Sequence, residues 1–113
     1  MTLSIEIRTT ADGGTVLDLN GEVDYATAPK IRETVSQVLR DADLKYIKVD
    51  VAKVTVLDST GIGTLVVAYR IAREMGVPVA VTNPTKFITR LFTVVGAQEL
   101  LEEQTNAFVV TGN

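Results

Sequence analysis

The chain has 113 residues, a net charge of −3, and neither cysteine nor histidine. This composition excludes disulfides, thiolate metal sites and a cysteine nucleophile, and it removes the most common general base and metal ligand. The acidic balance argues against nucleic-acid binding and favours a basic partner surface. We therefore expect a binding protein rather than an enzyme, with no metal and no cofactor.

The bulk properties also indicate where the protein works. A hydrophobic content of 46% fits a single globular domain over residues 1–113. The first residues, Met1–Ser4, lack the features of a signal peptide, and no apolar run reaches the length of a membrane span. We expect a cytoplasmic protein that is not bound to a membrane.

The N-terminal residues predict a β-hairpin. Leu3, Ile5 and Ile7 alternate with polar residues, which indicates a half-buried strand. The turn residues Ala11–Gly14 follow, and a second strand over Val16–Leu19 comes after them.

Helices and strands then alternate along the chain. The predicted elements are, in order, a helix from about Thr27 to Ala42 with Thr27 as N-cap, a strand over Tyr46–Val51, a largely buried helix over Ser59–Met75 that ends at Gly76, a strand over Val77–Val81, and a helix capped by Asn83, with Pro84 at its first position and Gly96 as its stop. Such alternation predicts an α/β domain with a mixed sheet of four to five strands, parallel after the hairpin, and three to four helices.

The last stretch is ambiguous. Leu100 and Leu101 fit a short strand or a helical turn, and Phe108–Val110 fits a strand or the start of a final helix.

Polar residues gather at one predicted edge of the sheet. In strand-to-helix units, ligands and partners usually meet the carboxyl ends of the parallel strands. The connections 21–26, 52–58 and 82–84 reach that edge. They bring the following polar residues into one neighbourhood: Glu22, Asp24, Asp58, Ser59 and Asn83.

The segment Asp58–Gly63 is a polar, glycine-bearing turn between apolar stretches. At the start of a helix, free N–H groups and the helix dipole favour an anion. An ordinary N-cap explains the same residues, and Gly61 and Gly63 fit either close packing of the helix on the sheet or the close approach of a partner. The spacing of the glycines matches no nucleotide-binding fingerprint.

Three segments of the chain resemble one protein family. Val56–Gly63, Gly21–Pro29 and Asn83–Phe92 are similar, in order and spacing, to the motifs of STAS domains, specifically the bacterial anti-sigma factor antagonists. The resemblance covers residues 3 to about 96. The following residues, Ala97–Glu103, depart from the strand and final helix with which these antagonists usually continue.

The resemblance implies a phosphorylation-controlled switch. Antagonists of this family bind an anti-sigma factor that is also a serine kinase, and the sigma factor is thereby freed. The kinase phosphorylates the serine after the motif aspartate, here Ser59, and a PP2C-type phosphatase reverses the modification. The alternatives are a STAS adaptor or structural subunit of a larger assembly (stressosome-like or lipid-transport), a nucleotide-binding STAS module, and a hydrolase that uses Asp24, Asp58 and Ser59.

The expected partner-binding surface combines the turn with its neighbours. Asp58 either orients Ser59 or caps the helix, and Glu22 and Asp24 form either an acidic wall or a solvated loop. Local capping is the simpler role for Thr60. The predicted partner-binding residues are Glu22, Asp24, Tyr25, Asp58, Ser59, Thr60, Gly61, Gly63 and Asn83.

Overall fold

The computed structural model describes residues 2–101 as a mixed α/β domain, so the prediction for Phe108–Val110 lies outside the described residues. The elements in chain order are β1 (Leu3–Thr9), β2 (Gly14–Val23), α1 (Ala28–Val38), β3 (Tyr46–Leu57), α2 (Ser59–Glu74), β4 (Val79–Thr82), α3 (Lys86–Val94) and a 3-10 turn, η1 (Gln98–Leu100).

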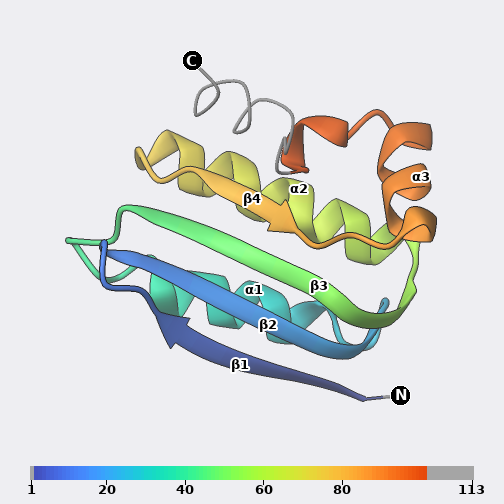
Figure 1. The fold of residues 1–113 in the computed structure, drawn as a ribbon, viewed down its shortest axis with the longest axis horizontal. Coiled ribbons are helices and arrows are strands. Elements are labelled where there is room, and N and C mark those ends of the chain that lie inside the picture. The colour runs from blue at the N-terminus through green and yellow to red at the C-terminus, as the bar shows by residue number, and fades with distance from the viewer. Residues whose placement is uncertain (1, 102–113) are drawn as a thin grey trace.

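The strands form one sheet in the order β1-β2-β3-β4. The β1–β2 hairpin is antiparallel, whereas β2–β3 and β3–β4 are parallel, as the alternation of elements predicts. Figure 1 shows α1 and α2 on one face of the sheet and α3 on the side of β4, and no described helix covers the opposite face. The sheet is therefore apolar toward the helices and polar toward water.

The core lies between the sheet and the helices. The strands alternate in burial, so Leu17, Leu19, Val49 and Val81 are buried, while Asp18 and Asp50 point to the open face. This alternation is expected of a sheet covered on one side only.

The third strand is longer than predicted, because it continues past Val51 to Leu57. The pairing with β2 shifts twice: Asp18 lies opposite Asp50, but Asn20 lies opposite Lys53, and a second shift follows Gly21. Each shift inserts an extra residue in β3, as in a β-bulge, and breaks the alternation of apolar residues. A prediction based on the alternation of buried and exposed residues therefore ends this strand too early.

The helices also differ in detail from the prediction. α1 ends at Val38, four residues before Ala42. α2 is less buried than predicted, since Val67, Ile71 and Met75 on its outer side are about half exposed. Covering a single face of the sheet leaves the other side of each helix in water. Val95 is likewise half exposed, just beyond the end of α3.

The residues after α3 settle the structure of Leu100 and Leu101, for which the sequence left a short strand or a helical turn open. Gly96 ends α3 with a positive φ of 75°, as its role of stop residue predicts. η1 follows, and Leu101 then forms an isolated parallel bridge to Val81 of β4. In the described part of the chain, the sheet has four strands and this single bridge in place of a fifth. Within residues 2–101, no helix combines the length and the hydrophobicity needed to cross a bilayer.

Candidate functional site

Asp58 connects the end of β3 to two other segments. It is the N-cap of α2, and its Oδ1 accepts a hydrogen bond of 2.8 Å from the N–H of Gly61. Its Oδ2 accepts a hydrogen bond of 3.2 Å from the N–H of Tyr25, in the loop between β2 and α1. The carboxylate is thus a helix cap, one of the two roles predicted for it, and it also fixes the loop of Tyr25 beside the start of α2.

Ser59 is the first residue of α2, and its side chain is exposed together with that of Thr60. The first backbone hydrogen bond of the helix runs from Ile62 to Asp58, over 3.0 Å. The N–H groups of Ser59 and Thr60 therefore precede the hydrogen-bonded ladder, where free donors and the helix dipole favour negative charge. The Ser59 hydroxyl is accessible from solvent at a point that tolerates an added anion.

The two glycines of the turn have different surroundings. A Cβ at Gly61 would lie 2.6 Å from Cγ1 of Val23 and 2.8 Å from its carbonyl oxygen, so Gly61 permits close packing of α2 on β2. Of the two roles predicted for Gly61, the geometry supports close packing of the helix on the sheet, because the close neighbour belongs to this chain. Gly63 is exposed, and nothing lies within 4 Å of the position of its Cβ.

Asp24 belongs to the interior rather than to an acidic wall. Its side chain is 6% exposed, and Oδ1 accepts hydrogen bonds from the N–H groups of Ala26 and Thr27, both at 3.0 Å. Oδ2 is buried without a hydrogen-bond partner among the described residues. The two sequence-based roles, an acidic wall and a solvated loop, are both wrong for Asp24, since the carboxylate organises the backbone before α1.

The N-cap of α1 differs in mechanism from the prediction. Thr27 occupies that position but makes no side-chain capping bond. Its hydroxyl donates to the carbonyl of Glu22 at 2.7 Å and accepts from the N–H of Asp24 at 3.0 Å. Asp24 and Thr27 thus bind each other's backbone and hold the loop in one conformation.

Glu22 and Tyr25 complete the neighbourhood of the turn. Glu22 is half-buried and accepts a hydrogen bond of 3.0 Å from the N–H of Thr2. Tyr25 is 79% exposed, although its N–H binds Asp58. A large exposed aromatic residue beside a fixed helix start is typical of a contact surface.

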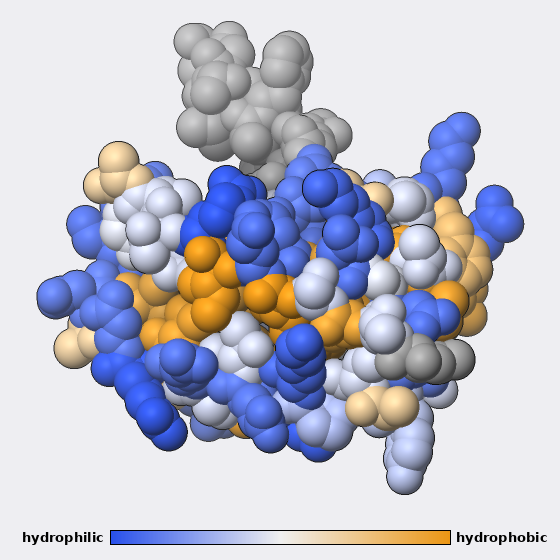
Figure 2. Space-filling view, turned by 90° about the horizontal axis from the view of Figure 1, so that it is seen from below, coloured by the Kyte–Doolittle hydropathy of each residue, from blue (hydrophilic) through white to orange (hydrophobic). Residues whose placement is uncertain are grey.

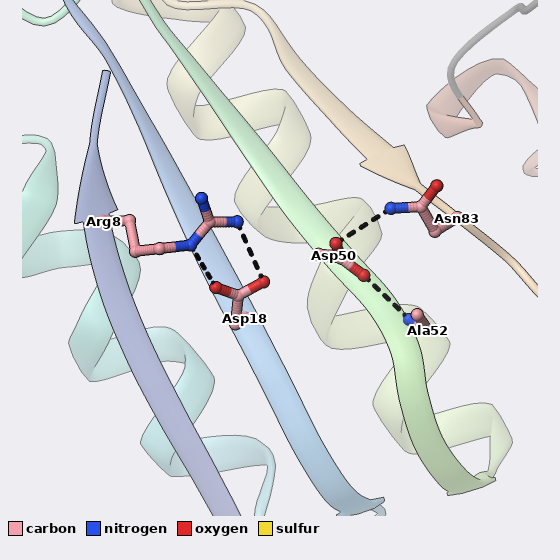
Figure 3. Close-up of polar contacts among 5 residues, drawn as sticks. All are labelled: Arg8, Asp18, Asp50, Ala52 and Asn83. Carbon is pink, nitrogen blue, oxygen red and sulfur yellow. Dashed lines mark hydrogen bonds and ion pairs between the residues drawn. The ribbon is translucent and has the colours of Figure 1, made fainter. Parts of the chain in front are cut away.

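Asn83 lies elsewhere and is not the cap of α3. Thr85 is the N-cap, and its side chain accepts from the N–H of Ile88 at 3.2 Å. Asn83 has a positive φ of 56° and donates from Nδ2 to Oδ2 of Asp50 at 2.9 Å. Figure 3 shows this pair on the open face of the sheet, in the middle of β3, rather than beside Asp58.

The open face carries a polar cluster that sequence motifs did not reveal. Arg8 of β1 binds Asp18 of β2 through two guanidinium nitrogens (Figure 3). These hydrogen bonds, and the charge of the guanidinium, hold the pKa of the Asp18 carboxyl below its ordinary value. The alternation of strand residues was the signal that could have placed these side chains together. Within residues 2–101, no group of acidic residues is arranged to hold a metal ion.

Comparisons with known proteins agree with this architecture. A family model described as the STAS domain matches residues 4–108. The anti-sigma-B factor antagonist of Listeria monocytogenes is 27% identical over 113 residues, covering 100% of this chain and 98% of that protein. Its counterpart in Staphylococcus aureus is 29% identical over 101 residues, covering 89% of this chain and 92% of that protein.

A solved structure shows the same fold. The anti-sigma factor antagonist SpoIIAA in its unphosphorylated form superposes with a TM-score of 0.75 at 18% identity, over 97% of this chain and 98% of that chain. The phosphorylated form of the Bacillus protein superposes with a TM-score of 0.69 at 17% identity, over 96% of this chain and 99% of that chain. With the family model matching nearly the whole sequence, the chain belongs to the STAS domain family.

Proposed function

We propose that this chain is an anti-sigma factor antagonist controlled by phosphorylation of Ser59. In its unmodified form it binds an anti-sigma factor that is also a serine kinase, and this binding frees the sigma factor. Phosphate on Ser59 ends the interaction, and a PP2C-type phosphatase restores it. The exchange takes place in the cytoplasm, and the chain acts as a regulatory binding protein rather than as an enzyme.

Two kinds of observation support the proposal. The curated relatives are named anti-sigma-B factor antagonists, and SpoIIAA has been solved both unphosphorylated and phosphorylated. The observation that carries the assignment to Ser59 is local: its hydroxyl is exposed at the first position of α2, whereas the neighbouring Asp58 is held by two backbone donors. A kinase can reach this hydroxyl without unfolding the turn.

The physical effect of the phosphate follows from its position. It adds a charge of about −1.5 to −2 at neutral pH. At the first turn of α2 this charge meets free N–H groups and the positive end of the helix dipole, so the helix is expected to persist. Asp58 is fixed beside the phosphate and adds to the negative charge. A partner fitted to the neutral hydroxyl and to Tyr25 would therefore be displaced by repulsion, bulk and the cost of desolvating the new charge.

The chemistry of the turn also favours binding over catalysis. A serine nucleophile needs a general base, and the chain has no histidine. The carboxylate nearest in sequence, Asp58, already accepts hydrogen bonds from Gly61 and Tyr25. It is oriented to hold the backbone in place, not to activate Ser59.

The proposal is tested by incubating the protein with ATP and anti-sigma serine kinases and mapping phosphate by mass spectrometry. We expect phosphate on Ser59, its loss in Ser59→Ala, and its retention in Thr60→Ala, which is the matched control because both hydroxyls are exposed. Phosphate on Thr60 instead would refute the assignment to Ser59.

Binding of the kinase supplies the second measurement. Phosphorylated protein and Ser59→Asp should both bind more weakly than the unmodified protein. Equal affinity of all three forms would overturn the switch. A stable complex with subunits of a larger assembly, insensitive to ATP, would indicate the adaptor alternative.

A further inference from the structure

β1 is an edge strand with a free side. In the described part of the chain it pairs only with β2. At its two ends, the N–H of Glu22 binds the carbonyl of Thr2, and the N–H of Thr10 binds the carbonyl of Gly14, both at 2.9 Å. Antiparallel pairs alternate in hydrogen bonding, so the even-numbered residues direct their backbone groups to β2 and the odd-numbered ones direct them outward.

The outward backbone groups are not all equally available. The carbonyl of Leu3 accepts a hydrogen bond of 2.7 Å from Nζ of Lys30 on α1. This contact agrees with the outward direction of the odd-numbered residues and covers the N-terminal end of the edge. Among residues 2–101, no other group pairs with the N–H and carbonyl groups of Ile5, Ile7 and Thr9, which form the rest of the free edge.

The free edge borders an apolar strip. The odd-numbered side chains of β1 point toward the helices, and their exposure increases along the strand: Leu3 is buried, Ile5 is half-buried and Ile7 is 46% exposed. Figure 2, seen from the side of β1 in Figure 1, shows a hydrophobic band running along the molecule between hydrophilic side chains. An unpaired strand edge beside an apolar band is a template for pairing with another chain.

The charged residues of β1 on the open face favour a second copy of the chain as partner and one alignment of the two β1 strands. Glu6 and Arg8 lie two residues apart on that face, on either side of Ile7. In an antiparallel pair of two β1 strands centred on Ile7, Glu6 of each copy lies opposite Arg8 of the other. Centring the pair on Glu6 would instead place the two glutamates opposite each other and would require the carbonyl of Leu3, which Lys30 already occupies.

We propose that β1 is a self-association surface, at which a second copy of this chain pairs antiparallel through residues 5–9 with Ile7 at the two-fold axis. The two Ile7 side chains then cover each other on the helix side, and on the open face Glu6 of each copy comes beside the Arg8–Asp18 ion pair of the other copy. The carboxylate of Glu6 makes no hydrogen bond or ion pair within residues 2–101, so it is available for this contact. The Ser59 turn follows β3 and stays outside the interface, because β2 lies between β3 and β1.

The paired stretch is short, and we expect a reversible dimer of the weak, small-interface class. Sedimentation equilibrium over a wide concentration range should show a monomer–dimer equilibrium for the wild-type chain. Glu6→Lys places a lysine opposite Arg8 of the other copy, and Arg8→Glu places a second glutamate opposite Glu6. Each single variant should weaken the dimer by about tenfold or more, because both cross-strand pairs change from attraction to repulsion.

Mixing the two single variants gives the decisive result. In a mixed dimer, the lysine introduced in one chain lies opposite the glutamate introduced in the other, and the remaining pair keeps the native Glu6 and Arg8. Association should therefore return only in the mixture. Glu74→Lys, an exposed charge reversal on α2, is the control and should dimerise like the wild type.

Hydrogen exchange supplies an independent readout of the same interface. Exchange at the amides of Ile5, Ile7 and Thr9 should slow as the protein concentration rises, because these N–H groups become paired only in the dimer. A wild-type chain that stays monomeric, or a dimer that both single variants leave unchanged, would overturn the proposal.

Discussion

Replacing Gly61 and Gly63 by alanine tests how α2 is held against the sheet. Both glycines lie in the first turns of α2, where alanine is favoured over glycine by about 1 kcal/mol. At Gly63 the new methyl group meets nothing within 4 Å, so Gly63→Ala should stabilise the protein by about 0.5–1 kcal/mol.

Gly61→Ala should have the opposite sign. Its Cβ would lie 2.6 Å from Cγ1 of Val23, 2.8 Å from the Val23 carbonyl oxygen and 3.0 Å from Cδ1 of Leu57. Overpacking costs about 1–3 kcal/mol, and the upper part of that range applies because a backbone oxygen cannot rotate away. After subtraction of the gain in helix propensity, a net loss of about 1–2 kcal/mol remains.

Urea denaturation followed by far-UV circular dichroism measures both variants against the wild type. The expected difference between the two alanine variants is about 2 kcal/mol, well outside the error of closely matched titrations. If Gly61→Ala proves as stable as Gly63→Ala, then the close packing of α2 on Val23 is wrong, and the glycine at position 61 needs another explanation.

Four further predictions concern the loop, the open face and the proposed interface. Asp58→Ala should lower the free energy of unfolding by about 1–2 kcal/mol, because two N–H donors lose their acceptor. Asp58→Asn should lower it by less, because the amide oxygen still accepts from one of the two donors. Asp24→Ala should lower the free energy of unfolding by about 2 kcal/mol or more, since two backbone donors lose their acceptor. Tyr25→Ala should leave the free energy of unfolding within about 0.5 kcal/mol of the wild-type value. Denaturant titration measures both variants. Asp18 and Asp12 have pKa values held below the ordinary one by hydrogen bonds from Arg8 and from Thr10 and Tyr46 respectively, so their stabilising effect is present above about pH 4 and is lost as pH falls through the lower folded-state pKa. Urea titrations at stepped acidic pH should therefore show a shallower loss of stability for Asp18→Asn, and a steeper or unchanged one would contradict the contact. Gly63→Ala should weaken binding of the kinase if the partner approaches Gly63, and an unchanged dissociation constant would remove Gly63 from the proposed interface.

The order of elements was predictable because the apolar residues repeat with clear periods. The hairpin follows from the alternation around Ile5, and the start of α2 follows from the polar turn before Ile62. The same method failed at the end of β3, where two bulges disrupt the alternation after Val51. It also assigned the cap of α3 to Asn83, although Thr85 lies equally well before the apolar stripe, and only the structure shows which side chain reaches the N–H of Ile88.

The sequence predicted which residues of the site lie near one another, but not what each side chain does there. Sequence placed Asp24, Asp58 and Ser59 at one edge of the sheet, and Asp58 does bind the loop that follows Asp24. Whether a carboxylate points to water or to a backbone N–H depends on the conformation of its loop, which spacing does not determine. Asp24 therefore looked like a surface charge until its burial and its bonds to Ala26 and Thr27 were known.

This division of roles determines which variants can report on function. Asp24, Asp58 and Gly61 hold the turn together, so substitutions there change folding and binding at once and cannot separate the two. Ser59 is exposed and lies where negative charge is favoured by about 0.3–1 kcal/mol, so Ser59→Asp should unfold no more easily than the wild type. If the same variant loses its partner, the loss must come from the altered surface, because the frame beneath it is intact. A phosphate at this position can thus control binding without lowering the stability of the domain.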